Sequence, residues 1–249
     1  MKLNTVDKAL RAIELLCENP RGLRLSEMSA MLDIPQSSLH HVLSTLSPFD
    51  YVQQDPETKK YSLGFRFLEI SKRILDNMDL RTIARKHLDE LYKQSQESTH
   101  LSILRNKKLV FIEKIGSPVG LSLATYIGFA TDPHAAAAGK VLLADLSEKE
   151  IRDMYRDVEI KSYAKNTIQD LGRLLNELAR IRAQGYAIDD EEYYEGVRCV
   201  AAPVTAGGKA IAAISITGSI FSFTWERVER ELKPLVLGTA NQISKELRW

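Results

Sequence analysis

Two short amphipathic patterns stand out in the N-terminal part of the chain. Apolar side chains fall on one helical face in each, first at Leu25, Met28 and Leu32 and then at Leu39, Val42, Leu43 and Leu46. The turn Asp33-Ile34-Pro35 separates them, because Pro35 cannot continue the first helix but suits the first turn of the second. The pattern predicts a helix-turn-helix, whose second helix can enter a DNA major groove.

The polar face of the second helix carries the candidate DNA contacts. These residues have short or medium hydrogen-bonding side chains: Gln36, Ser37, Ser38, His40, His41 and Ser44. Such side chains suit base edges and phosphate oxygens. An ordinary solvated face on a pair of core helices would look the same, so the flanking elements decide between the two readings.

The flanking elements favour DNA binding. Upstream lies a further helical stripe, formed by Val6, Ala9, Leu10, Ile13, Leu16 and Cys17. Downstream, the β-rich runs YVQQ and KYSL surround a turn at residues 55–59, which predicts a hairpin. Three helices followed by a hairpin form a winged helix-turn-helix over residues 1–64. Lys59 and Lys60 at the wing tip can hold a flanking phosphate.

Charge and composition limit the partners. Residues 1–64 hold seven Lys and Arg against eight Asp and Glu, a net charge of −1, whereas DNA-binding domains are usually basic. We therefore expect a monomer to bind DNA weakly and a dimer to be needed. The whole chain of 249 residues carries a net charge of +1, which gives no general attraction to membranes. Two cysteines without a CxxC pair, and no apolar signal or membrane-spanning run, predict a cytoplasmic protein.

The rest of the chain predicts a linker helix and an α/β domain. Residues 65–78 form the linker helix, with Phe67, Ile70, Ile74 and Leu75 on one side. From residue 79 to 249, a helix at 80–96 is followed by strands alternating with helices, which indicates one sheet covered by helices. Turns are expected at 105–108 and 206–209. The fold class is α+β, and the first helix and the linker helix are the expected pairing surfaces of a dimer.

Three features of the larger domain suggest a ligand pocket. The run HAAAAGK begins a helix after Asp132-Pro133, and its small side chains leave the N–H groups near Ala137 and Ala138 open to a carboxylate or phosphate. Tight packing of alanines on the sheet would explain the same run. Strand alternation puts Ser215 and Thr217 on one face. A loop with Leu123, Tyr126 and Phe129 is expected to form a lid that tolerates an apolar or aromatic ligand body.

Other function classes have less support. A nucleophilic Cys199 with His134 or His100 as its base is conceivable, but no sequence feature brings them together. A zinc site built from His87, His100, His134 and Cys199 lacks any tight ligand spacing. A pure scaffold would account for the helices but not for a helix-turn-helix with a wing.

Five runs together carry a family resemblance: IPQSSLHHVLSTL, YVQQDPETKKYSLG, HAAAAGKVLLA, GYAIDDEEYYEGVRCVAAPV and AAISITG. The chain resembles the IclR family of bacterial transcription regulators, essentially end to end. Two positions depart from that family, which usually has Arg where His41 stands and often Lys where Gln36 stands. The turn after Val204 is also shorter than the family's. The first departure leaves the operator sequence open, and the second is confined to a loop.

The resemblance implies a GAF-like effector domain that binds a small-molecule effector, expected to be a carboxylate, and needs no cofactor. Its ligand site would consist of the backbone at Ala137 and Ala138 with Asp189, Cys199, Ser215 and Thr217. Cys199 could instead be a buried small apolar residue, and Asp189 could cap a turn in the acidic run 189–192. The expected partner is double-stranded operator DNA, bound by a homodimer or a dimer of dimers. Repression and activation are both open.

Overall fold

The computed structural model describes residues 4–116 and 125–247. The chain divides into two compact units, Met1–Asn77 and Met78–Trp249. Each unit has its own hydrophobic core, so each is described by itself.

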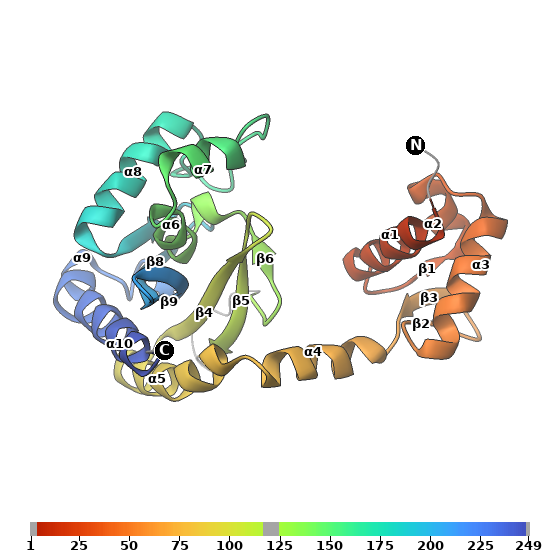
Figure 1. Cartoon of the computed structure of the whole chain (residues 1–249), viewed down its shortest axis with the longest axis horizontal. Coiled ribbons are helices and arrows are strands. Elements are labelled where there is room, and N and C mark those ends of the chain that lie inside the picture. Colours follow the sequence, from red (N-terminus) through yellow and green to blue (C-terminus); the bar gives the residue numbers. More distant parts are fainter. Residues whose placement is uncertain (1–3, 117–124, 248–249) are drawn as a thin grey trace. The chain divides into compact units, whose positions relative to one another are not determined.

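The N-terminal unit is a winged helix-turn-helix followed by a helix (Figure 1). Its elements are α1 (Thr5–Glu18), β1 (Leu23–Arg24), α2 (Leu25–Leu32), α3 (Gln36–Leu46), the 3₁₀ turn η1 (Ser47–Phe49), β2 (Val52–Gln54), β3 (Lys60–Leu63) and α4 (Arg66–Asp76). The predicted helices and hairpin are confirmed. The short strand β1, which the sequence pattern did not predict, pairs with β3 and makes the wing a three-stranded sheet.

The turn between α2 and α3 is held by hydrogen bonds as well as by its sequence. Asp33 adopts a left-handed backbone conformation with φ of 53°, which ends α2. The hydroxyl of Ser29 donates to the carbonyl of Ile34 at 2.6 Å, and the guanidinium of Arg11 donates to the carbonyl of Leu32 at 3.0 Å. Beneath the turn, Met28, Leu39 and other buried apolar residues form the core of this unit. These two hydrogen bonds and the core packing together fix the angle between α2 and α3.

The apolar stripe predicted on α1 is partly wrong. The buried residues of α1 are Ala12, Leu15 and Leu16. Val6 and Leu10 are 67% and 57% exposed, and Cys17 is exposed too. The helix carries two apolar stripes, because Val6, Leu10, Ile13 and Cys17 recur at helical spacing on a side that faces away from the core. The linker helix α4 likewise has no buried residue.

The C-terminal unit is one antiparallel sheet between two layers of helices. The strands are β4 (Ser98–Arg105), β5 (Lys108–Ile115), β6 (Ala130–Thr131), β7 (Ala187–Asp190), β8 (Val197–Ala206) and β9 (Lys209–Ser219), in the order β6-β5-β4-β9-β8-β7. The helices are α5 (Asp79–Ser95), η2 (Pro133–Ala135), α6 (Ala137–Ala144), α7 (Glu148–Met154), α8 (Leu171–Gln184), α9 (Trp225–Arg227), the π-helix η3 (Val228–Leu232) and α10 (Lys233–Glu246).

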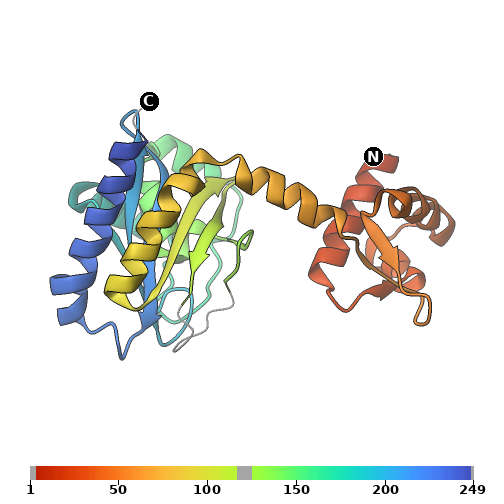
Figure 2. The same ribbon diagram turned by 90° about the horizontal axis from the view of Figure 1, so that it is seen from below.

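The two helical layers cover opposite faces of the sheet. Helices α5 and α10 lie side by side on one face (Figure 2), where Leu88, Ile216 and Val236 are buried. Helices α6, α7 and α8 cover the other face, where Leu143, Ile151 and other apolar residues are buried. This arrangement confirms the predicted α+β class with one helix-covered sheet.

Two details of this unit differ from the predicted elements. The last helix, expected to run without a break over residues 225–247, contains the π-helix η3. Pro234 explains the interruption, because it has no N–H to donate to the carbonyl four residues before it. The alanine helix begins at Ala137, later than expected, because Pro133–Ala135 forms a 3₁₀ turn.

Gly139 allows α6 to lie against that 3₁₀ turn. A Cβ atom at Gly139 would lie 2.2 Å from the carbonyl oxygen of Pro133, which is inside van der Waals contact. We therefore expect Gly139→Ala to lower the free energy of unfolding by about 1–3 kcal/mol through overpacking. Gly238→Ala is the matched control, since Gly238 lies in α10 with nothing within 4 Å of an added Cβ. Thermal denaturation that gave equal midpoints for both variants would contradict this account.

Candidate functional site

Helix α3 presents a polar face to solvent. Leu39, Val42 and Leu43 are buried on its inner side. Five of the six predicted DNA-contacting residues of α3 are exposed, and these are Gln36, Ser37, His40, His41 and Ser44. The sixth differs, because the half-buried Ser38 accepts a hydrogen bond from Nζ of Lys8 at 2.8 Å. Ser38 thus ties the start of α3 to α1.

The two histidines of α3 have free rings on this face. The hydroxyls of Ser44 and Thr45 both donate to the backbone carbonyl of His41, at 2.9 and 2.8 Å. Neither imidazole, at His40 or His41, makes a hydrogen bond to another residue within 4–116 or 125–247. The side-chain nitrogens are therefore available to an incoming partner.

The tip of the wing is rigidified by Asp55. Its carboxylate accepts hydrogen bonds from the backbone N–H groups of Glu57 and Thr58, at 3.0 and 2.7 Å, and from the Thr58 hydroxyl. These hydrogen bonds, led by the one from the Thr58 backbone, lower the pKa of Asp55. The turn leaves Lys59 exposed and Lys60 half-buried. Two cations therefore sit on a defined turn beside the three-stranded sheet.

In the C-terminal unit, strand pairing brings the predicted ligand residues together. Thr217 lies opposite Cys199, and Cys199 lies opposite Asp189, so these three form one row across β9, β8 and β7. Two residues along, Ser215 of β9 lies opposite His100 of β4. Residues two apart share a face of a sheet, so both rows lie on the side covered by α6.

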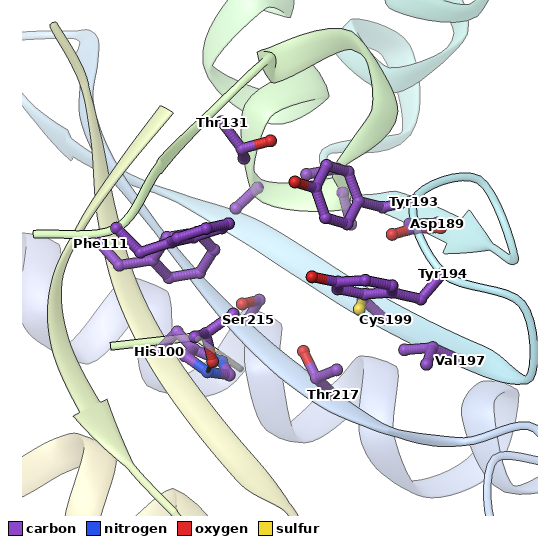
Figure 3. A pocket seen from close by; sticks show the side chains of 15 residues that line it. His100, Phe111, Thr131, Asp189, Tyr193, Tyr194, Val197, Cys199, Ser215 and Thr217 are labelled. Atoms are coloured by element: carbon purple, nitrogen blue, oxygen red, sulfur yellow. Dashed lines mark hydrogen bonds between the residues drawn. The ribbon is translucent and has the colours of Figure 1, made fainter. Parts of the chain in front are cut away.

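A cavity lies between these rows and α6 (Figure 3). Its volume is ≈ 40 Å³, which is room for a few water molecules. Its lining consists of His100, Phe111, Thr125, Phe129, Thr131, Ala136, Ala137, Ala138, Asp189, Tyr193, Tyr194, Val197, Cys199, Ser215 and Thr217. Seven of the nine residues expected to bind the effector are among them.

Of the other two expected residues, only Tyr126 belongs to the described part of the chain. Tyr126 is 62% exposed and outside the lining, and its ring packs edge-on against Phe129 at 5.5 Å between centroids. Leu123 lies outside the described residues.

Several lining residues were missed by sequence reasoning. His100 could have been found from the sequence, because it lies in a predicted strand. Pairing of that strand with β9 places His100 opposite Ser215. Tyr193 and Tyr194 directly follow the acidic run 189–192, and the sequence pattern assigned them no role. Their rings pack edge-on at 4.7 Å, and Tyr163 stacks on Tyr193 at 4.6 Å. No local pattern predicts that this loop folds back over the sheet.

The first turn of α6 opens onto the cavity. Ala136 precedes the helix in extended conformation and provides no side-chain cap. Within the described part of the chain, the N–H groups of Ala137 and Ala138 have no hydrogen-bond acceptor. Free N–H groups at the positive end of a helix dipole attract an anionic oxygen. The alanines also pack tightly, as the alternative reading expected, because Ala137 and Ala138 belong to the apolar core.

The lining residue Asp189 belongs to a buried cluster of three titratable residues, with Lys140 and Glu192. Nζ of Lys140, which is buried, donates to the carbonyl of Ile188 at 2.7 Å and pairs with the Glu192 carboxylate. Asp189 accepts a hydrogen bond from the Glu192 backbone N–H at 2.8 Å, so it both caps this turn and lines the cavity. Burial, reinforced by the Glu192 charge, raises the pKa of Asp189 to about 7. Near neutral pH, a large fraction of Asp189 is therefore protonated and can donate a hydrogen bond.

Burial also favours the neutral forms of two further lining residues, Cys199 and His100. Burial raises the pKa of the Cys199 thiol well above its usual value. Burial, together with the charge of Lys114, lowers the pKa of His100 to about 3. An un-ionised thiol is a poor nucleophile, and an imidazole this weak is a poor base. His134 lies outside the lining, where its Nε2 is 2.9 Å from the carbonyl oxygen of Lys161.

The zinc alternative also lacks a geometric basis. His87 lies on α5, across the sheet from the cavity, where it pairs with Glu246 at 2.9 Å. Among residues 4–116 and 125–247, no cluster of three or more His, Cys, Asp or Glu side chains could hold a metal ion. No helix in these same ranges has the length and apolar character needed to cross a membrane.

Comparison with known proteins agrees with this geometry. Residues 5–56 match the model of the IclR helix-turn-helix domain, and residues 72–245 match that of the bacterial transcriptional regulator IclR C-terminal domain. The chain is 35% identical over 216 residues to the HTH-type transcriptional regulator XynR of Escherichia coli, covering 86% of each chain. It is 33% identical to KdgR of the same organism, covering 99% of this chain and 94% of that one.

A solved structure extends the comparison. An IclR homologue from Microbacterium hydrocarbonoxydans, complexed with 4-hydroxybenzoate, superposes with a TM-score of 0.82. The alignment covers 98% of this chain and 99% of that chain, at 20% sequence identity, and thus shows a shared fold.

Together, the winged head and the C-terminal domain define a DNA-binding transcription regulator rather than an enzyme. The chain belongs to the IclR family of bacterial transcription regulators.

The buried Asp189 makes a testable contribution to stability. Its pKa is about 7 in the folded protein and about 3.9 in an unfolded chain, so the folded state keeps a proton that the unfolded state loses as pH rises from 4 to 7. Wild-type stability therefore falls over that window. We expect Asp189→Asn to gain stability relative to wild type as pH rises from 4 to 7, by up to about 4 kcal/mol, and the difference to level off above pH 7. Denaturant unfolding at each pH measures it, and a pH-independent difference would be inconsistent with this assignment.

Proposed function

We propose that a small organic acid binds in the cavity beneath α6 and changes the affinity of the winged heads for operator DNA. The observation that carries this proposal is the first turn of α6, whose free N–H groups at Ala137 and Ala138 open onto a buried cavity lined by hydroxyls. The proposed mechanism concerns only the affinity of the winged heads for operator DNA. A change in that affinity can produce either repression or activation.

The donors around the cavity suit a carboxylate. One carboxylate oxygen would accept from the N–H groups of α6, and the other from the Thr217 hydroxyl or the protonated Asp189. Ser215 and the Cys199 thiol would flank the adjoining carbon. The Microbacterium homologue was solved with an aromatic carboxylate, which agrees with this class of ligand.

The walls favour a planar body behind the acid. Phe111, Phe129, Tyr193 and Tyr194 supply aromatic surface, and the volume of ≈ 40 Å³ leaves little room as the side chains stand. A ligand larger than a few heavy atoms would therefore have to displace the two tyrosines. We infer that the loop carrying them moves when the effector enters and leaves.

The polar face of α3 is the surface that we assign to DNA. Gln36, Ser37, His40, His41 and Ser44 would meet base edges and nearby phosphates, while Ser38 positions the helix through Lys8. Lys59 and Lys60 of the wing would hold a flanking phosphate.

A homodimer is the expected DNA-binding form, in the cytoplasm where the operator is. The outward stripe of α1 and the exposed Phe65, Leu68 and Ile74 around α4 leave apolar surface that a second copy would cover. Two heads paired in this way would place their α3 helices in successive major grooves, about 34 Å apart. A dimer of dimers through the C-terminal domains is the further assembly that the family resemblance implies.

The reading face can be tested with two substitutions of different kind. His41→Ala should relax sequence preference by about 1–3 kcal/mol if its ring contacts a base. Lys60→Ala should weaken binding to all sequences alike and reduce the salt dependence, because it removes one phosphate contact. Gel-shift titrations against operator and scrambled DNA at two salt concentrations separate the outcomes. If His41→Ala retained full selectivity, α3 would not read DNA as assigned.

The effector site can be tested separately from DNA binding. Ser215→Leu should fill the cavity, so that an acid effector no longer changes operator affinity while affinity without effector stays at the wild-type level. Calorimetric titration with the acid and gel shifts with and without it provide the two readouts. An effector response that survived this substitution would place the ligand elsewhere.

A further inference from the structure

His100 lines the β4 end of the cavity, away from Cys199 and Asp189. It lies on β4, two strands from Cys199 on β8 and three from Asp189 on β7. With strands spaced about 4.8 Å apart, the backbone of β4 lies on the order of 10–14 Å across the sheet from Cys199 and Asp189, and one strand spacing from Ser215 on β9. A carboxylate held by α6 and Asp189 would therefore leave the β4 end of the cavity, where His100 lies opposite Ser215, to the rest of the ligand.

The imidazole of His100 is buried in the cavity wall, and one of its two nitrogens has no hydrogen-bond partner among the described residues. Its side chain is only 1% exposed, and its ring packs edge-on against Phe111 at 5.2 Å between centroids. Nε2 lies 3.1 Å from the Thr125 hydroxyl oxygen, within hydrogen-bond distance. Nδ1 is buried and has no hydrogen-bond partner among the described residues. Most buried polar atoms are paired, so an unpaired one at a cavity indicates a ligand group that pairs with it.

The Thr125 contact makes the ring adaptable. If Nε2–H donates to the Thr125 oxygen, Nδ1 is an acceptor; if the Thr125 hydroxyl donates to Nε2, Nδ1 carries the proton and donates. The neutral ring can therefore meet either a hydroxyl or a carbonyl oxygen of a ligand.

We propose that His100 determines effector specificity by hydrogen bonding to a hydroxyl or keto oxygen at the end of the ligand remote from its carboxylate. The proposal rests on the proposed function, in which the carboxylate lies at α6. It narrows the ligand class to elongated hydroxy or keto acids, and it separates them from short acids.

Matched pairs of acids test the proposal by calorimetry. The pairs are 4-hydroxybenzoate with benzoate and 5-oxohexanoate with hexanoate, and pyruvate serves as the short acid. We expect wild type to prefer the oxygenated member of at least one pair by about tenfold, the size of one good hydrogen bond. His100→Phe should reduce that preference to within about twofold, and His100→Gln, which keeps a donor and an acceptor, should restore part of it. His87→Phe is the matched control, because His87 lies across the sheet.

Thermal denaturation of each variant shows that it is folded, so a lost preference is not lost structure. Equal affinities within both pairs for wild type, or a preference that persists in His100→Phe, would overturn the role of His100. Binding of pyruvate alone would overturn it too, but would leave the proposed function standing. If none of the five acids bound, the proposed function would fail together with it.

Discussion

The close packing of α6 against the turn before it is the constraint on which the proposed effector site depends. Gly139 lets the helix backbone approach Pro133, and the extended Ala136 turns the first N–H groups toward the sheet rather than capping them. A larger residue or a capping side chain at this place would fill the cavity or satisfy the donors. The run of small residues therefore does more than pack, since it leaves the N–H groups of Ala137 and Ala138 free at the cavity among the described residues.

The remaining electrostatics of the cavity follow from burial. Lys140 is paired with Glu192 below the cavity, and Asp189, Cys199 and His100 have pKa values that favour their neutral forms near or below neutral pH. An anion entering this site would meet hydrogen-bond donors and a helix dipole, not a competing carboxylate or a reactive thiolate. The same burial that makes the residues unsuitable for catalysis suits them for reversible binding, which is what a regulator needs.

The sequence predicted much of this architecture because its signals are local. Periodicity located α2, α3 and the strands β4, β5, β7, β8 and β9, and alternation on β9 put Ser215 and Thr217 on one face. What it missed depends on tertiary packing. The two stripes of α1 looked like one, because a solvent-facing apolar stripe has the same spacing as a buried one. Tyr193 and Tyr194 reach the cavity only because their loop folds over the sheet. The π-helix η3 arises because Pro234 has no N–H to donate within the helix.

Regulation requires that the acid bind more tightly to one arrangement of the DNA-binding heads than to another, since a ligand with equal affinity for both would shift nothing. We propose that this difference begins at α6. Labelling the alanines with ¹⁵N and titrating an acid that alters operator binding would observe this step directly. The account predicts large, saturable shifts of the Ala137 and Ala138 amide resonances. An acid that altered operator binding while both resonances stayed in place would contradict it.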